Sequence, residues 1–194
     1  YSGNTPSYLV KLTVTSSFGC VSDTTYIVSF FPISNFDFYP EYYSYCEGET
    51  VNFFDNTTIA STSSITSWEW TFGCGHNSFL QNPTHVFDSA GSYFVQLKLT
   101  TSDGCTYQDT LYSPLVIYPN PVADFEAVPN EVSVFRPEVY FDNLSTGAFS
   151  YIWNFGDNTT DTDPTPTHMF PNVVGIYTTK LYAYSSFGCS DSTT

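Results

Sequence analysis

Residues 92–105 read SYFVQLKLTTSDGC, and from Tyr93 onward every second side chain is apolar or aromatic. The members of this alternation are Tyr93, Val95, Leu97 and Leu99. Because successive side chains of a strand point to opposite faces, the period of two predicts a β-strand with one face in a core. The Ser-Asp-Gly that follows predicts a turn at the end of the strand.

The same pattern occurs twice more, as YLVKLTVTSSFGC at 8–20 and IYTTKLYAYSSFGC at 176–189. The tyrosines that open the three alternations are 85 and 84 residues apart. In the first stretch the period predicts an inward face of Tyr8, Val10, Leu12 and Val14. The opposite face of each stretch carries one lysine, for which we expect solvent exposure and a cross-strand partner: Lys11, Lys98 and Lys180.

The register continues upstream in two of the three copies. SWEWTFGCG at 67–75 aligns with SYIWNFGDN at 150–158, and NPTHVF at 82–87 aligns with TPTHMF at 165–170. A repeat of about 84 residues follows. We expect three copies: 1–31, the C-terminal part of a domain; 32–118, a complete domain; and 119–194, a domain lacking its last strand. The occurrence of SSFGC in both the first and the third copy, 169 residues apart, suggests a longer period of two domains.

Composition limits the fold and the partners. Aromatic residues make up 19% of the chain, and with the many Ser and Thr they favour an all-β fold. The net charge of −15, from 19 acidic and 4 basic residues, argues against nucleic acid and anionic membranes as partners. No apolar run is long enough to insert into a membrane. We expect any export signal to lie outside this stretch.

The motifs W-x-F-G-[DC], [NT]-P-T-H-x-F, G-x-Y-x-x-x-L and G-C, in this order, resemble the PKD domain. That resemblance implies tandem immunoglobulin-like β-sandwiches, with histidines that pack and hydrogen-bond within the sandwich. The motif residues are Trp70, Trp153, His85 and His168. The linker YPNPVADF together with the G-C pattern is similar to tandem arrays on exported Bacteroidota surface proteins. Such arrays are secreted by the type IX system and include gliding and adhesion proteins.

The chain departs from the family at one turn. The usual Gly-Asp-Gly is Gly73-Cys74-Gly75 in the second copy and Gly156-Asp157-Asn158 in the third. Any role of that aspartate is therefore absent from the second copy. His76, which follows, is expected to be a solvated turn residue.

We find no motif for catalysis or for a metal centre, so we expect neither an enzyme nor a bound cofactor. The ion that the sequence still allows is calcium, because one loop carries three carboxylates, which are hard oxygen ligands: Asp157, Asp161 and Asp163. A solvated acidic turn is the competing interpretation.

Five cysteines in a chain without catalytic motifs indicate an oxidising exterior, hence an extracellular or cell-surface location. The family resemblance favours a Cys46–Cys105 disulfide. The topology of an immunoglobulin-like sandwich puts these two at opposite ends, so Cys46–Cys74 and Cys46–Cys189 stay open as alternatives. Cys20 is expected to have no partner within the chain. The same holds for Cys189, unless the Cys46–Cys189 pairing forms.

Kinship with Bacteroidota would also make short Asp-Ser/Thr patterns acceptors for O-glycosylation. The acceptor residues would be Thr24, Ser89, Thr110 and Ser192. The competing interpretation is ordinary turn and strand composition.

The repeat and the lack of catalytic motifs predict a structural segment of an extracellular stalk, filament or adhesin, acting as a stiff spacer. Its partners would be neighbouring repeats, and the strand missing from the third copy could come from the same chain or from a neighbouring subunit. The alternative is an accessory module that binds carbohydrate or protein. Its candidate surface is a row of aromatics: Tyr39, Tyr42, Tyr43 and Tyr45.

Overall fold

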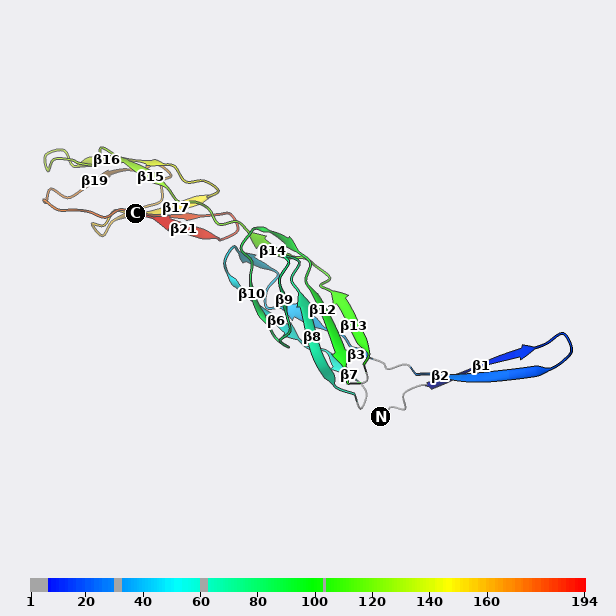
Figure 1. The fold of residues 1–194 in the computed structure, drawn as a ribbon. Coiled ribbons are helices and arrows are strands. Elements are labelled where there is room, and N and C mark those ends of the chain that lie inside the picture. Colours follow the sequence, from blue (N-terminus) through cyan, green and yellow to red (C-terminus); the bar gives the residue numbers. More distant parts are fainter. Residues whose placement is uncertain (1–6, 30–32, 60–62, 103) are drawn as a thin grey trace. The chain divides into compact units, whose positions relative to one another are not determined.

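The computed structural model describes residues 7–29, 33–59, 63–102 and 104–194. Every regular element in these ranges is a β-strand, so the predicted all-β class is confirmed (Figure 1). Within the same ranges there is no helix that could cross a membrane. The chain forms two compact units: residues 1–43, 50–85 and 93–115 make the first, and residues 44–49, 86–92 and 116–194 the second.

The first copy is a two-stranded hairpin of β1 (Ser7–Thr15) and β2 (Val21–Ser29), drawn in blue in Figure 1. Lys11 forms its cross-strand ion pair with Asp23. The predicted inward face is wrong for Val10, Leu12 and Val14, because these three side chains are more than half exposed. Among the described residues, no second sheet covers either face of this hairpin.

The first unit also contains most of the second copy. Its largest sheet has the order β13-β12-β8-β9, made of β13 (Thr106–Thr110), β12 (Gln96–Thr101), β8 (Ile65–Thr71) and β9 (Asn77–Ser78). A second sheet has the order β10-β6-β4, made of β10 (Thr84–Val86), β6 (Thr50–Asp55) and β4 (Phe38–Pro40). A short pair joins β3 (Ile33–Asn35) to β7 (Thr58–Ile59).

Trp70 lies at the centre of this core, fully buried, with ring centroids 5.5 Å from Phe38 and 5.7 Å from Phe53. Its indole N–H donates to the carbonyl of Leu80 at 2.9 Å. The alternation in the 92–105 stretch is correct here, because Val95, Leu97 and Leu99 are buried. A buried aromatic with its polar hydrogen satisfied explains why this position takes tryptophan.

The third copy repeats the arrangement within the second unit. One sheet has the order β15-β16-β19, made of β15 (Phe125–Val128), β16 (Glu138–Asn143) and β19 (Thr167–Met169). The other has the order β18-β17-β20-β21, made of β18 (Thr160–Asp161), β17 (Ser150–Asn154), β20 (Lys180–Tyr184) and β21 (Ser190–Thr193). Trp153 is buried in this core and donates to the carbonyl of Asp163 at 2.9 Å, as Trp70 does to Leu80.

A further sheet has the order β11-β14-β5, made of β11 (Gly91–Tyr93), β14 (Leu115–Tyr118) and β5 (Ser44–Cys46). β14 pairs in parallel with β5, Ile117 opposite Tyr45. Leu115 and Ile117 of β14 are buried.

Candidate functional site

A disulfide links the second copy to the third. Cys46, at the end of β5, is bonded to Cys189, in the loop between β20 and β21, with the two Cα atoms 5.6 Å apart. Both residues lie in the second compact unit. The favoured Cys46–Cys105 pairing is wrong, and Cys46–Cys74 does not form, since Cys20, Cys74 and Cys105 are free thiols. Cys189 therefore has a partner within the chain.

The loop that carries Cys189 is closed by the same two hydrogen bonds in all three copies. The amide of Ser185 donates to the carbonyl of Cys189, and the Ser185 hydroxyl accepts from the Cys189 amide. Ser16 with Cys20, and Thr101 with Cys105, make the same two bonds. The glycine before each cysteine has a positive φ, which favours glycine. The phrase SSFGC thus encodes a rigid loop that presents a cysteine.

A second contact reinforces the disulfide. The ring of Phe187 stacks on that of Tyr118, the last residue of β14. The turn after Cys46 is held in place as well: the Glu47 amide donates to the carbonyl of Tyr118 at 3.0 Å, and Asn120 Nδ2 donates to the carbonyl of Glu47 at 3.1 Å. Sequence reasoning missed Phe187, Tyr118 and Glu47, although the phrase shared by the first and third copies pointed to this loop.

The two repeated histidines occupy equivalent sites. His168 stacks on Phe155, with centroids 3.9 Å apart, and its Nε2 lies 2.8 Å from Asp157 Oδ2. Burial acts to raise the pKa of Asp157, but hydrogen bonds from Thr159 and His168 outweigh it and hold the pKa below its usual range. His85 stacks on Phe72 at 4.3 Å, and its Nε2 lies 3.1 Å from Cys74 Sγ.

The calcium candidates are not brought together. Asp157 faces His168, while Asp161 and Asp163 each accept from backbone amides of their own turn, at Thr162 and Thr165. In the described part of the chain, the group whose ligand atoms converge is a different one: Cys74, His76 and His85.

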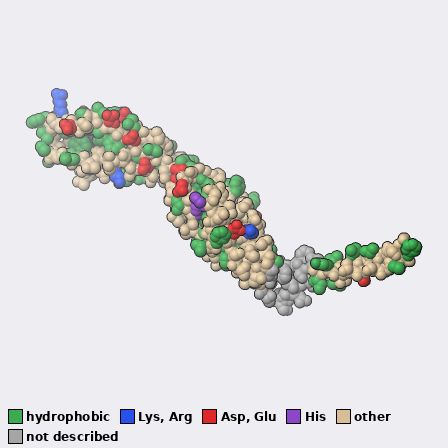
Figure 2. Space-filling view, viewed as in Figure 1, with side chains coloured by type: hydrophobic (Ala, Val, Ile, Leu, Met, Phe, Trp, Pro, Cys, Tyr) green, Lys and Arg blue, Asp and Glu red, His purple; other side chains and the backbone are tan. Residues whose placement is uncertain are grey.

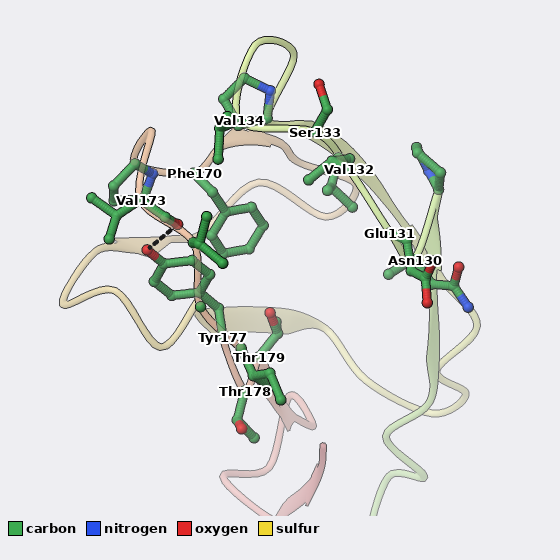
Figure 3. Close-up of a pocket in the computed structure, with 18 of the residues that line it drawn as sticks. Asn130, Glu131, Val132, Ser133, Val134, Phe170, Val173, Tyr177, Thr178 and Thr179 are labelled. Atoms are coloured by element: carbon green, nitrogen blue, oxygen red, sulfur yellow. Dashed lines mark hydrogen bonds between the residues drawn. The ribbon is translucent and has the colours of Figure 1, made fainter.

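An open groove lies on the third copy, shown in Figure 3. Its volume is about 920 Å³, and it lies between residues 129–134 and residues 173–179. The rings of Phe170 and Tyr177 border it, and the Tyr177 hydroxyl donates to the carbonyl of Val173 at 3.4 Å. Tyr177 is the repeat equivalent of Tyr93 in β11, so the groove occupies the place that β14 fills in the second copy.

The remaining predicted positions are at or near the surface. Tyr39, Tyr42 and Tyr43 are 42, 62 and 46% exposed, and Tyr45 is half-buried in β5. Of the acceptor candidates, Thr24, Ser89 and Ser192 are exposed, and Thr110 is half-buried at the end of β13.

The PKD domain family matches residues 40–113 and 118–194, which together are more than half of the chain. The chain therefore belongs to the PKD domain family, in tandem form. PKD domains are non-catalytic modules with an immunoglobulin-like β-sandwich.

Two curated relatives are a microbial collagenase of Vibrio alginolyticus, 37% identical over 59 residues, and collagenase ColA of Bacillus cereus, 36% identical over 62 residues. These stretches are 30 and 32% of this chain but only 7 and 6% of the collagenases. Among solved structures, the PKD1 domain of the Vibrio cholerae metalloprotease PrtV is 26% identical. The match covers 42% of this chain and 94% of that one, with a TM-score of 0.36.

Proposed function

We propose that this chain is a segment of an extracellular stalk, filament or adhesin, in which PKD copies 1–31, 32–118 and 119–194 act as a stiff spacer. The observation that carries the proposal is the Cys46–Cys189 disulfide. A bridge between successive copies restricts rotation at the linker, where two copies joined by a few residues alone would be free to reorient. The bridge also supports an oxidising, extracellular location.

Surface charge supports the same role. Acidic side chains outnumber basic ones on the face shown in Figure 2, in line with the net charge of −15. Like-charged segments repel one another, so long arrays would stay soluble and apart. We further propose export as part of a surface array of the Bacteroidota type, with neighbouring repeats as partners. Support for this comes from the linker and G-C motifs.

The test is the distribution of distances between fluorophores on the second and third copies. We expect a narrow distribution for the oxidised chain and a broad one for C46S/C189S. The matched control is C20S/C105S, which removes two free thiols and should behave like the parent chain. A broad distribution in the oxidised parent would contradict the spacer proposal.

A second candidate function is a binding module for glycan or protein. The exposed tyrosines that precede β5 favour it, because aromatic rings with an apolar face and a polar tip suit such surfaces. A glycan array with the parent chain and Y42A/Y43A separates the two proposals. Binding that the double variant loses supports a module; an array without signal supports the spacer.

A further inference from the structure

The second and third copies can be aligned without a gap from the tryptophan strand to the repeated histidine. Over residues 67–87 and 150–170 the offset is constant, so Cys74 corresponds to Asp157, His76 to Thr159, and His85 to His168. The turn occurs twice in the structure, once in each compact unit. This inference is independent of the proposed spacer function.

In the third copy, two side chains of the turn reach the imidazole. Asp157 Oδ2 is 2.8 Å and Thr159 Oγ1 is 3.4 Å from Nε2 of His168. With Gly156 as the first position of the turn, the side chains of the second and fourth positions, Asp157 and Thr159, therefore contact His168. This geometry belongs to the backbone of the turn, so any residues at the two positions are directed to the same place.

In the second copy both positions carry side chains that can bind a metal ion. Cys74 Sγ lies 3.1 Å from His85 Nε2 and 3.7 Å from His76 Nδ1, and the ligand atoms of all three residues are within 4.8 Å of one another. A tetrahedral zinc ion, with bonds of about 2.3 Å to sulfur and about 2.0 Å to nitrogen, sets its ligand atoms about 3.5 Å apart. The observed separations bracket that value.

We propose that Cys74, His76 and His85 bind a zinc ion, with a water molecule in the fourth position. One thiolate and two imidazoles are borderline-soft ligands that suit Zn²⁺ and disfavour Ca²⁺ and Mg²⁺, which require oxygen. Cys74 and His85 are partly buried and His76 is exposed, so solvent and ions have access. The exchange of Asp and Thr for Cys and His converts a hydrogen-bonded turn into a metal site.

The site is held in shape before any ion binds. His85 is stacked on Phe72 with ring planes 4° apart. The ring of His76 packs against that of His85 in a T-shaped contact, with an interplanar angle of 66°. The Phe72 amide donates to the carbonyl of His76 at 3.2 Å and closes the turn. Gly73 and Gly75 both have positive φ, which only a glycine adopts freely. Little ordering is left for the ion to impose, which favours affinity.

The experiment uses the full chain in a C20S/C105S background, where Cys46 and Cys189 are bridged and Cys74 is the single free thiol of the five cysteines. Cobalt(II) serves as the spectroscopic probe and Zn²⁺ as the competitor. We expect one equivalent of Co²⁺ to give a thiolate charge-transfer band and the visible bands of a four-coordinate ion. Zn²⁺ should displace it and slow the alkylation of Cys74.

Two variants make the test specific. C74D/H76T installs the residues of the third copy, which fold around the same histidine there. It should lower Zn²⁺ affinity more than about a hundredfold, since even loss of a group that only supports a ligand costs ten- to a hundredfold. The converse variant, D157C/N158G/T159H, should create a second site and raise the stoichiometry from one to two.

The alternative is a thiol–imidazole hydrogen bond without metal, which takes the place of the Asp157–His168 pair. Absence of the cobalt–thiolate band, or unchanged Zn²⁺ affinity in C74D/H76T, would overturn the metal site. Binding of copper(I) but neither Zn²⁺ nor Co²⁺ would overturn the assignment to zinc.

Discussion

The ring of Phe187 lies against that of Tyr118, with centroids 3.9 Å apart and planes 5° from parallel. Phe187 belongs to the loop that also presents Cys189 to Cys46. The equivalent Phe18, in the same loop of the first copy, is 94% exposed. The same local sequence thus contributes a stabilising contact in one copy and an uncovered ring in another, which provides a matched pair for mutagenesis.

Replacement of Phe187 by Ala should lower the free energy of unfolding by about 1 kcal/mol, the usual range for one aromatic pair at a partly exposed site. Urea denaturation followed by tryptophan fluorescence measures the change. F18A removes the same side chain from a site without such a contact and should cost less than about 0.5 kcal/mol. Equal losses in both variants would mean that the stack contributes nothing.

Removal of the disulfide should lower the free energy of unfolding more than any of the other proposed substitutions. The bridge spans a sequence separation of 143 residues. By loop entropy alone this stabilises the native state by up to about 5 kcal/mol. We expect C46S/C189S to unfold at markedly lower urea concentration than the parent. C20S/C105S controls for the loss of two cysteines and should match the parent.

Gly156 cannot accept a side chain. Its φ is +81°, and a Cβ there would lie 2.6 Å from the carbonyl oxygen of Thr178. G156A should therefore cost more than the roughly 1–2 kcal/mol of the left-handed conformation alone. Gly188 has a φ of +89° with no atom within 4 Å of such a Cβ, so G188A measures the conformational cost alone. Equal melting points for the two variants would show that the backbone yields at Thr178.

Stability should fall in acid through Asp157. Its folded pKa lies below the unfolded value of about 3.9, so the unfolded state binds the proton more tightly. The contribution is complete above about pH 5 and is lost as the pH falls through 3.9 and then the folded pKa. D157N should flatten the dependence of unfolding free energy on pH in this range.

The groove of the third copy should accept a strand in trans. A peptide of residues 113–119, SPLVIYP, carries the side chains that fill the equivalent place in the second copy. We expect saturable binding by fluorescence anisotropy and a higher melting temperature at saturating peptide, because a ligand of the native state stabilises it. A control peptide with aspartate for Leu115 and Ile117 should not bind. Equal binding of both peptides would exclude recognition as a strand.

The period of two predicted the buried faces of strands that have a second sheet to pack against. It placed Leu97 and Leu99 correctly but failed for Val10 and Leu12, since burial depends on what covers a strand and not on its pattern. The tryptophan and histidine positions followed from the repeat. The hydrogen-bond partners of the two tryptophans, the carbonyls of Leu80 and Asp163, belong to the backbone and leave no mark in the sequence.

The favoured Cys46–Cys105 pairing was wrong because the pairings were weighed mainly within one sandwich; the pairing that forms, Cys46–Cys189, was an open alternative. Cys46 is instead bonded to the following copy, and the signal for this was the repetition of SSFGC. The Cys74, His76 and His85 cluster was missed for another reason. Cys74 and His76 were interpreted as turn residues and His85 as architecture, and only the fold shows that the turn brings all three together.

The bridge between Cys46 and Cys189 also sets how far the chain can be drawn out under tension. A force applied outside the bridge passes through the sulfur atoms and leaves the polypeptide between them slack. At about 3.4 Å per extended residue, the 143-residue separation corresponds to roughly 500 Å of length that cannot be released. A tether made of such segments would keep a nearly constant length even if the strands enclosed by the bridge unfolded.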